Sequence, residues 1–255
     1  MGISWAAASD QGRRRSSNED HHAARQDLGL FVVADGMGGH VAGEVASRLA
    51  VEGIEAFVAE TVKMRTDDTW PLPLDPSLSR DGNRLKGAFR IANRKIADEM
   101  AASENLRGMA TTASAVLISG GRAAVAHVGD SRVYLLRDNE LSRLTRDHSW
   151  VEEQVRRGAL TATAARHHPW RNVVTRALSG GEDADHDVTE FALGESDRLL
   201  LCSDGLFSVV VDDRISELLG QPGALQAICD GLVDAANAAG GPDNITALVL
   251  QIDVS

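Results

Sequence analysis

Three apolar runs of this chain each end in an aspartate at a turn that glycine marks. The aspartates are Asp35, Asp130 and Asp204, and a fourth, Asp243, stands just before the apolar run Ile245–Leu250. Short apolar runs bounded by Gly, Pro and Asn are typical of buried strands. The sequence therefore places four carboxylates at strand ends, where a rigid scaffold meets loops and functional groups usually lie.

Four carboxylates that converge must repel one another. Two unit charges about 4 Å apart repel by about 1 kcal/mol in water and by about 4 kcal/mol at an effective dielectric constant of about 20. Such a cluster is stable only if it takes up protons or binds cations. The chain has no Cys and His pair at the spacing of a zinc site, and oxygen ligands favour hard ions such as Mg²⁺ or Mn²⁺. Any one of these aspartate motifs alone would indicate an ordinary turn, as Asp-Gly after a strand does, but the four together predict a multi-carboxylate metal site.

Further motifs accompany these aspartates in a fixed order along the chain. They are Ser9–Asp20, Val33–Glu44, Met109–Thr112, Val128–Arg132, Ser203–Leu206 and Asp243–Thr246. In this order they resemble the motifs of the metal-dependent protein Ser/Thr phosphatases (type 2C, PPM family) in their bacterial form. The resemblance runs from residue 9 to residue 246. A series of ordered motifs is a far more specific signal than one Gly-rich loop.

The chain departs from the family pattern in two places. Ala110 stands where the family usually has glycine, which predicts a slight displacement of the loop before Thr111. The Pro-rich stretch Trp70–Ser79 follows no motif of the family. Neither departure involves a predicted metal ligand, so we expect the activity to be retained.

The apolar periodicity predicts an α+β fold. Alternation and turn residues indicate an antiparallel meander of four short strands across Thr111–Leu144, and further strands at Ile3–Ala8, Leu28–Ala34, Asp187–Ala192, Arg198–Ser203 and Ile245–Ile252. Helical spacing indicates helices at 43–63, from Arg80 to Met100, at Ser149–Arg157, at Asp213–Leu219 with Asp212 as N-cap, and at Ala224–Ala238. Consecutive strands together with separate blocks of helices are typical of an α+β fold, in which helices cover antiparallel sheets. The resemblance implies a central β-sandwich of two antiparallel sheets flanked by helix pairs.

Composition narrows the class of protein. We expect one catalytic domain over residues 1–255, with 43% hydrophobic and 25% charged residues as in an ordinary globular protein. The formal net charge of −11 argues against a nucleic-acid or anionic-membrane surface. The chain has neither a long apolar stretch nor a basic-then-apolar N-terminal segment, so we expect a cytoplasmic protein. Cys202 lies in an apolar run, which indicates a reduced core residue rather than a disulfide.

The resemblance implies a specific set of metal ligands for two to three Mn²⁺ or Mg²⁺ ions. Asp35 would bridge two central ions, with the carbonyl of Gly36 on the second ion. The other ligands would be Asp204 and Asp243 on the first ion, Glu19 and Asp20 through metal-bound waters, and Asp130 with Asp204 at a third position. Two such ions can polarise phosphoryl oxygens and convert a bridging water to hydroxide near neutral pH.

Two further residues would act on the substrate. Arg15 is the candidate phosphate clamp, because its planar donor fork matches phosphate oxygens. His40 is the candidate proton donor to the leaving group, because an unperturbed imidazole pKa near 6.5 suits that task. Arg13 and Arg14 are interpreted as surface charges.

The remaining histidines have other expected roles. His127 lies inside an apolar run and is interpreted as a hydrogen-bonded core residue. His148 is expected to orient loops, and His167 and His168 to lie on a loop surface. The segment of about residues 159–180 has few large apolar side chains, so it is interpreted as a mobile flap that gates substrate.

The leading hypothesis is an enzyme that hydrolyses phosphoserine and phosphothreonine on proteins. A water that bridges two metal ions would attack the phosphorus directly, without a covalent intermediate. The substrates would be proteins phosphorylated by an opposing Ser/Thr kinase. The enzyme is expected to be a monomer. One alternative is a catalytically silent pseudo-phosphatase that binds phosphoproteins, which lost ligands would signal. Another is a regulatory phosphatase in a partner-switching pathway, which usually carries attached sensor domains.

Overall fold

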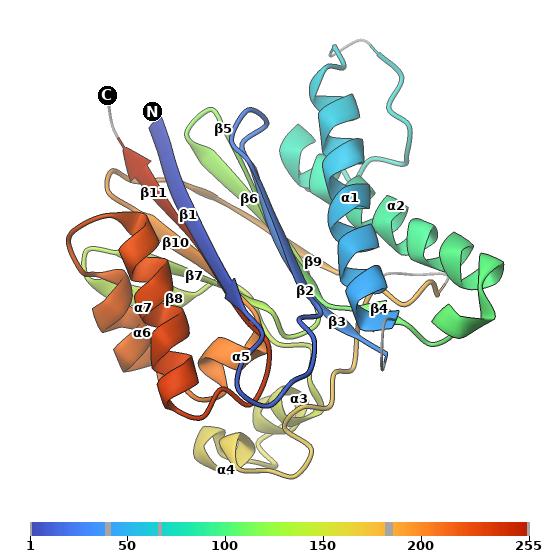
Figure 1. The fold of residues 1–255 in the computed structure, drawn as a ribbon. Helices are drawn as coiled ribbons and strands as arrows, with labels where there is room; N and C mark the ends of the chain where they lie inside the picture. The colour runs from blue at the N-terminus through green and yellow to red at the C-terminus, as the bar shows by residue number, and fades with distance from the viewer. Residues whose placement is uncertain (1, 39–41, 66–67, 182–185, 254–255) are drawn as a thin grey trace.

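The computed structural model describes residues 2–38, 42–65, 68–181 and 186–253. Its strands form two antiparallel sheets that stack face to face, and helices cover the outer face of each sheet (Figure 1). Apolar side chains fill the space between the sheets and the space between each sheet and its helices. This is the α+β sandwich that the sequence predicts.

The first sheet has the strand order β1-β11-β10-β7-β8. Successive side chains of a strand point to opposite faces. In the central strand, Leu199 and Leu201 therefore pack against the second sheet, whereas Leu200 and Cys202 pack against the helices. The strands are β1 (Gly2–Asp10), β7 (Arg132–Arg137), β8 (Glu140–Arg143), β10 (Arg198–Cys202) and β11 (Ile245–Asp253).

The second sheet has the order β2-β3-β5-β6-β9, and the short β4 pairs with the end of β3. Phe31 and Val33 face the first sheet, and Leu30 and Val32 face the helices. The strands are β2 (Asp20–Arg25), β3 (Leu30–Met37), β4 (Ala110–Thr111), β5 (Ala113–Ser119), β6 (Arg122–Val128) and β9 (Asp187–Ala192).

Two groups of helices cover the sandwich (Figure 1). The second sheet is covered by α1 (Ala42–Val62) and α2 (Arg80–Ala102), and the first sheet by α5 (Asp204–Phe207), α6 (Asp212–Leu219) and α7 (Leu225–Ala238). Ser79 caps α2 by accepting hydrogen bonds from the first amides of the helix. The short helices are the 3₁₀ turn η1 (Glu104–Leu106), α3 (Trp150–Arg156) and α4 (Ala162–Arg166).

The structure corrects the strand predictions in two places. The segment Thr111–Leu144 is not one meander, because β5 and β6 form a hairpin in the second sheet and β7 and β8 form one in the first. The chain crosses between the sheets at Gly129–Ser131, which carries Asp130. Strand β2 was not predicted, because its sequence is mostly polar or small and has no apolar run.

The structure also corrects two predictions on helices and loops. Asp212 is the first residue of α6, and Val211 is its N-cap without a side-chain hydrogen bond. The segment 159–180 is not structureless, because it contains α4, and Leu178 is fully buried and bridges to Thr111. His167 lies on its surface as expected, whereas His168 is half-buried and its ring packs against Trp150 and Trp170. Cys202 and Cys229 are free and buried, as expected of core cysteines.

Among the described residues, no helix is both long and apolar enough to cross a membrane.

Candidate metal centre

The alternation of the strands brings polar side chains together at one end of the sandwich. In the second sheet, Asp20 and Asp35 are register partners on β2 and β3, and Asp35 continues the inward-facing series of Phe31 and Val33. Strand β3 runs on to Met37, so Asp35 lies within the strand and not after its end. The inward-facing side chains Phe31 and Val33 of β3 are apolar, and this series becomes polar at Asp35.

A cavity of about 440 Å³ opens at this end. Most of the predicted site residues line it: Arg15, Glu19, Asp35, Gly36, Asp130, Asp204 and Asp243. Asp20 is buried, with 7% of its surface exposed, and does not line the cavity. His40 lies outside the residues that the structure describes. Five of the six sequence motifs thus contribute a predicted site residue to one place.

Asp20 joins the two sheets beneath the cavity. Its Oδ2 accepts hydrogen bonds from Ser203 Oγ at 2.6 Å and from Thr246 Oγ1 at 2.7 Å. Its Oδ1 is buried and has no hydrogen-bond partner among the described residues. Burial raises the pKa of Asp20 to about 6, despite the hydrogen bonds, which oppose the shift. Ser203 and Thr246 stand within two of the sequence motifs, but no pattern in the sequence indicates this role.

The carboxylates of the cavity destabilise one another's charge. Burial raises the pKa of Asp130 to about 7 and holds the pKa values of Asp35 and Asp204 well above their usual range. Repulsion adds to these shifts, since Asp35 is close enough to Asp20 and Asp204 to be affected by both. Without a cation the cluster must therefore hold protons near neutral pH.

These residues fit a hard cation. Asp204 Oδ1, like Asp20 Oδ1, is buried and without a hydrogen-bond partner in the described structure, although buried polar atoms are normally paired. The side-chain donors of the cluster are carboxylate oxygens, which suit Mg²⁺ or Mn²⁺. Gly36 adds a backbone group at a position where no larger residue fits, because a Cβ there would lie 2.0 Å from the carbonyl oxygen of Gly43.

Arg15 and Asp243 form an ion pair at the rim of the cavity. Arg15 Nη2 donates to Asp243 Oδ2 at 2.6 Å, and the two side chains are 51% and 22% exposed. The hydrogen bond to Asp243 raises the pKa of Arg15. The predicted phosphate clamp is thus bonded to a predicted metal ligand.

Asn244 fixes the loop that carries Arg15 and Glu19. Its side-chain amide donates to the carbonyls of Gln11 and Ser17 at 2.9 and 2.8 Å, and its Oδ1 accepts from the amide of Glu19 at 2.9 Å. Asn244 therefore holds the first motif against the last one. The sequence gives no sign of this role beyond the place of Asn244 in the last motif, directly after Asp243.

The segment Gly129–Ser131, where the chain passes from one sheet to the other, is held by hydroxyl groups on β5 and on the residue just before it. Ser131 Oγ lies 2.5 Å from Thr112 Oγ1, and Thr112 Oγ1 accepts from the amide of Asp35 at 3.2 Å. Ser114 Oγ donates to the carbonyl of Ser131 at 2.7 Å. The backbone next to Asp130 is therefore tied to the backbone of Asp35.

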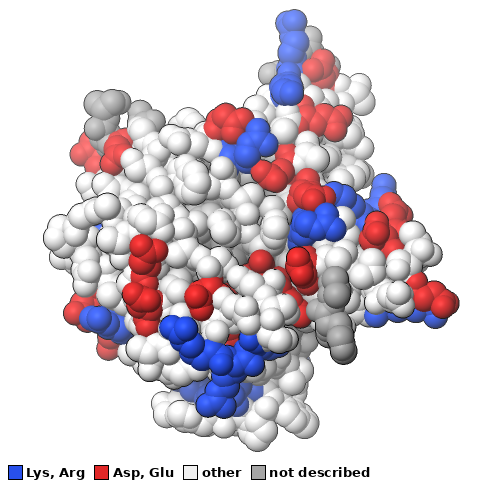
Figure 2. All heavy atoms as spheres, viewed as in Figure 1, with Lys and Arg blue, Asp and Glu red and all other residues white. Residues whose placement is uncertain are grey.

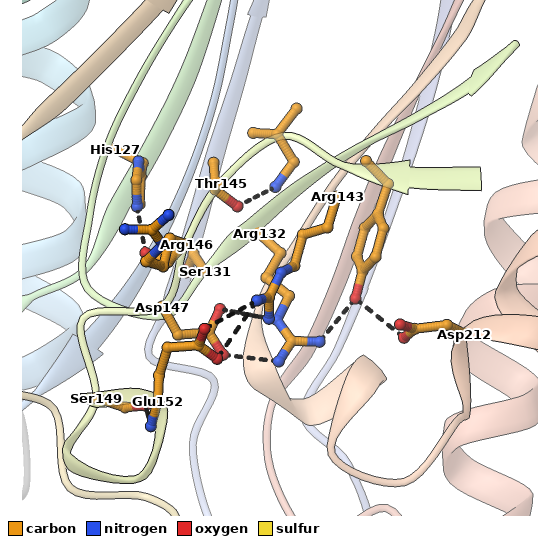
Figure 3. Close-up of polar contacts among 12 residues, drawn as sticks. His127, Ser131, Arg132, Arg143, Thr145, Arg146, Asp147, Ser149, Glu152 and Asp212 are labelled. Atoms are coloured by element: carbon orange, nitrogen blue, oxygen red, sulfur yellow. Dashed lines mark hydrogen bonds and ion pairs between the residues drawn. The ribbon is translucent and has the colours of Figure 1, made fainter. Parts of the chain in front are cut away.

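A buried guanidinium supports the same crossing from the other side (Figure 3). Arg132 binds Asp147 through two parallel hydrogen bonds of 2.9 and 2.7 Å and also donates to Tyr134 Oη at 2.8 Å. It stacks on Phe207 with 3.7 Å between its Cζ and the ring centroid. Phe207 ends the helix α5 that Asp204 begins. One arginine thus links the chain segments of two predicted metal ligands.

His127, His148 and Asp187 form a second group that is close enough to hold a metal ion. The amide of Gly129 donates to His148 Nδ1 at 3.2 Å, so the ring proton is on Nε2, which faces Asp187 Oδ2 at 3.4 Å. His127 Nε2 lies 2.7 Å from the carbonyl of Arg146 and must donate to it (Figure 3). Burial lowers the pKa of both rings. The group is thus explained as two neutral, hydrogen-bonded histidines, and His148 orients the backbone beside Asp130.

The sequence profile described as "Protein phosphatase 2C" matches residues 10–244. The chain belongs to the protein phosphatase 2C family. It is 38% identical to the serine/threonine protein phosphatase PstP of Mycobacterium tuberculosis over an alignment of 255 positions, which covers 98% of this chain but 45% of that protein. The chain thus spans less than half the length of PstP. It is 35% identical to the serine/threonine phosphatase stp of Listeria monocytogenes, with 96% of this chain and 94% of that protein covered.

Solved structures of the phosphatase 2C family share the fold. A crystal structure of the M. tuberculosis phosphatase PstP/Ppp superposes with a TM-score of 0.88 at 37% identity and full coverage of both chains. The PstP catalytic domain in complex with two manganese ions superposes with a TM-score of 0.84 at 36% identity and 99% coverage of both. The family and the α+β sandwich fold predicted from the sequence are confirmed.

Proposed function

We propose that this chain is a metal-dependent phosphatase that hydrolyses phosphoserine and phosphothreonine on proteins. The observation that carries the proposal is a solvent-accessible cavity lined by carboxylates, with buried Asp20 beneath it, in which two carboxylate oxygens of described residues lack hydrogen-bond partners. Asp20 and Asp204 each leave one buried oxygen without a hydrogen bond in the described structure. The names of relatives that match nearly the whole chain support the same activity.

The residues of the cavity would hold two to three Mn²⁺ or Mg²⁺ ions. We assign Asp35, Gly36, Asp204 and Asp243 to the two central ions and Asp130, with Asp204, to a third. Glu19 and Asp20 would bind through ordered water. The two manganese ions bound by the related PstP catalytic domain support the proposal that this chain binds metal. Bound ions of this kind polarise phosphoryl oxygens and lower the pKa of water.

The residues of this chain would then bind and orient the substrate. Arg15 lies at the rim and is half exposed, so its guanidinium can exchange Asp243 for two oxygens of a phosphoryl group. The exchange would also free Asp243 for a cation. His40 would donate a proton to the leaving alkoxide of the serine or threonine.

The substrates we propose are phosphoproteins that a Ser/Thr kinase produces. We further propose that residues 1–255 form one domain, that it acts in the cytoplasm as a monomer, and that 159–180 selects substrates. Asn172 and Val174 of that segment line the cavity, which supports a role in substrate contact. Shortening 159–171, which spares buried Leu178, should alter selectivity among phosphopeptides more than hydrolysis of an aryl phosphate. Equal losses on both would mean that the segment only supports the site.

The pseudo-phosphatase alternative predicts lost ligands, and the sequence retains all seven predicted metal ligands. The test is phosphate release from a phosphothreonine peptide with Mn²⁺, with excess chelator, and with the Asp35→Asn variant. Turnover should require the metal and should fall by at least a hundredfold in the variant. Undiminished turnover in chelator would refute the proposal.

A further inference from the structure

Two loops at the rim of the cavity carry arginines that the catalytic proposal does not use. Arg13 and Arg14 precede Arg15 on the loop between β1 and β2, and Arg171 precedes Asn172, which lines the cavity. All three are exposed. Figure 2 shows Lys and Arg side chains gathered over the loop that joins β1 and β2, beside acidic side chains. The acidic cavity therefore has a basic rim.

In the described part of the chain, none of these three guanidiniums forms an ion pair with a carboxylate, although Arg13 lies close enough to Asp10 to lower the pKa of that carboxyl. Other arginines near the cavity are paired, such as Arg15 with Asp243 and Arg132 with Asp147. The guanidiniums of Arg13, Arg14 and Arg171 are exposed, so they remain available to an anionic partner.

The backbone beneath Arg13 and Arg14 is fixed. The amide of Arg13 donates to the carbonyl of Gly241 at 2.8 Å. Gly12 has a φ of +79°, and a Cβ there would lie 2.1 Å from the carbonyl oxygen of Asp243, so only glycine fits this contact. The loop thus presents the two side chains from a constant position relative to the cavity.

We propose that Arg13, Arg14 and Arg171 select phosphorylated segments that carry Asp or Glu close to the phosphoserine or phosphothreonine. The inference rests on the proposed function. A phosphoryl group in the cavity places the flanking residues of its peptide at the rim, within reach of both loops. Guanidinium groups bind carboxylates with planar, charge-assisted hydrogen bonds. Complementary charges at a rim raise association rates and discriminate against like-charged partners.

The test uses three phosphothreonine peptides of equal length with acidic, neutral or basic flanks. Wild-type kcat/KM should be about tenfold higher for the acidic than for the basic peptide at low salt, and this ratio should shrink as salt rises from about 0.05 M to about 0.5 M. In the triple variant Arg13→Ala, Arg14→Ala, Arg171→Ala, the ratio should fall to about twofold or less.

The matched control removes three exposed cations elsewhere. Lys63, Arg90 and Arg94 lie on and after the helices that cover the second sheet, and their replacement by Ala changes the net charge equally. This control should keep the wild-type ratio. A wild type that does not discriminate, a rim variant that still prefers the acidic peptide, or a control that loses the preference would each overturn the inference.

Hydrolysis of p-nitrophenyl phosphate separates this inference from the proposed function, because that substrate has no flanking residues. If the wild type with Mn²⁺ hydrolyses neither it nor any peptide, the phosphatase proposal fails, and the inference with it. If it hydrolyses p-nitrophenyl phosphate but treats the three peptides alike, only the selectivity inference fails.

Discussion

Arg15 Nη2 and Asp243 Oδ2 lie 2.6 Å apart, so the predicted phosphate clamp and a predicted metal ligand neutralise each other. The pair joins the first sequence motif to the last one at the open side of the cavity. Because the two side chains are 51% and 22% exposed, the pair is screened by water and can be exchanged at low cost. The relationship suggests that cation binding to Asp243 and phosphate binding to Arg15 favour each other.

The first prediction concerns Arg15. Replacing Arg15 by Ala should raise KM more than it lowers kcat, by about tenfold against about threefold, because the guanidinium binds the phosphoryl group in the ground state. Arg15→Lys should recover part of the loss, since Lys keeps the charge but not the planar fork. Steady-state kinetics on one phosphopeptide measures both effects. A collapse of kcat at constant KM would assign Arg15 to the transition state instead.

The second prediction concerns Asp130. Asp130→Ala should leave two Mn²⁺ ions bound per chain while slowing turnover about tenfold or more, because its carboxylate is assigned only to the third ion. Metal analysis after dialysis and steady-state kinetics give the two numbers. The control Asp213→Ala removes an exposed carboxylate from α6 and should change neither. Loss of the central ions in Asp130→Ala would refute the assignment.

The third prediction concerns pH in the presence of chelator. The pKa of Asp130 is raised to about 7, so the folded chain holds a proton that the unfolded chain releases above pH of about 4. The free energy of unfolding should therefore fall as pH rises through this window. Asp130→Asn has no proton to lose. It should match the wild type near pH 4, where the unfolded carboxyl still holds most of its proton, and exceed its stability near pH 8, on the order of 1–4 kcal/mol.

Urea unfolding of both proteins at the two pH values measures this difference. Adding Mn²⁺ at pH 8 should reverse the order, because the ion favours the charged carboxylate. A difference between the two proteins that does not change with pH would contradict the raised pKa.

The sequence pattern predicted the helices and strands that bury apolar side chains. Helices α1, α2 and α7 were predicted within a few residues, because their buried side chains recur at helical spacing. Strand β10 was predicted because Leu199, Leu200 and Leu201 are buried on both faces. Strand β2 has only intermediate burial apart from Asp20, so it has no apolar run to detect.

The site itself was only partly predictable. The aspartates stand in recognisable motifs, so their convergence could be expected before the structure was known. The supporting contacts join residues far apart in the chain, as Asp20 with Thr246 and Asn244 with Gln11 do. No local pattern marks such pairs, because they arise from the register of two sheets. For the same reason the sequence did not show that the hairpins after Thr111 belong to different sheets.

The fourth prediction concerns the buried pair Arg132 and Asp147. Asp147→Ala leaves the Arg132 charge buried, so it should lower the free energy of unfolding by about 3–5 kcal/mol. The control Asp27→Ala breaks the exposed pair with Arg25 and should cost about 0–1 kcal/mol. Urea unfolding curves of the two variants with chelator present make the comparison. Equal losses would mean that the Arg132 pair does not stabilise the crossing beside Asp130.

The central claim is that the buried carboxylates form a metal centre. The most direct measurement is an anomalous-difference map from crystals grown with Mn²⁺. The map should show at least two peaks in the cavity, each within about 2.5 Å of a carboxylate oxygen of Asp35, Asp204 or Asp243. A map with no peak in the cavity, or with manganese only at His127, His148 and Asp187, would contradict it.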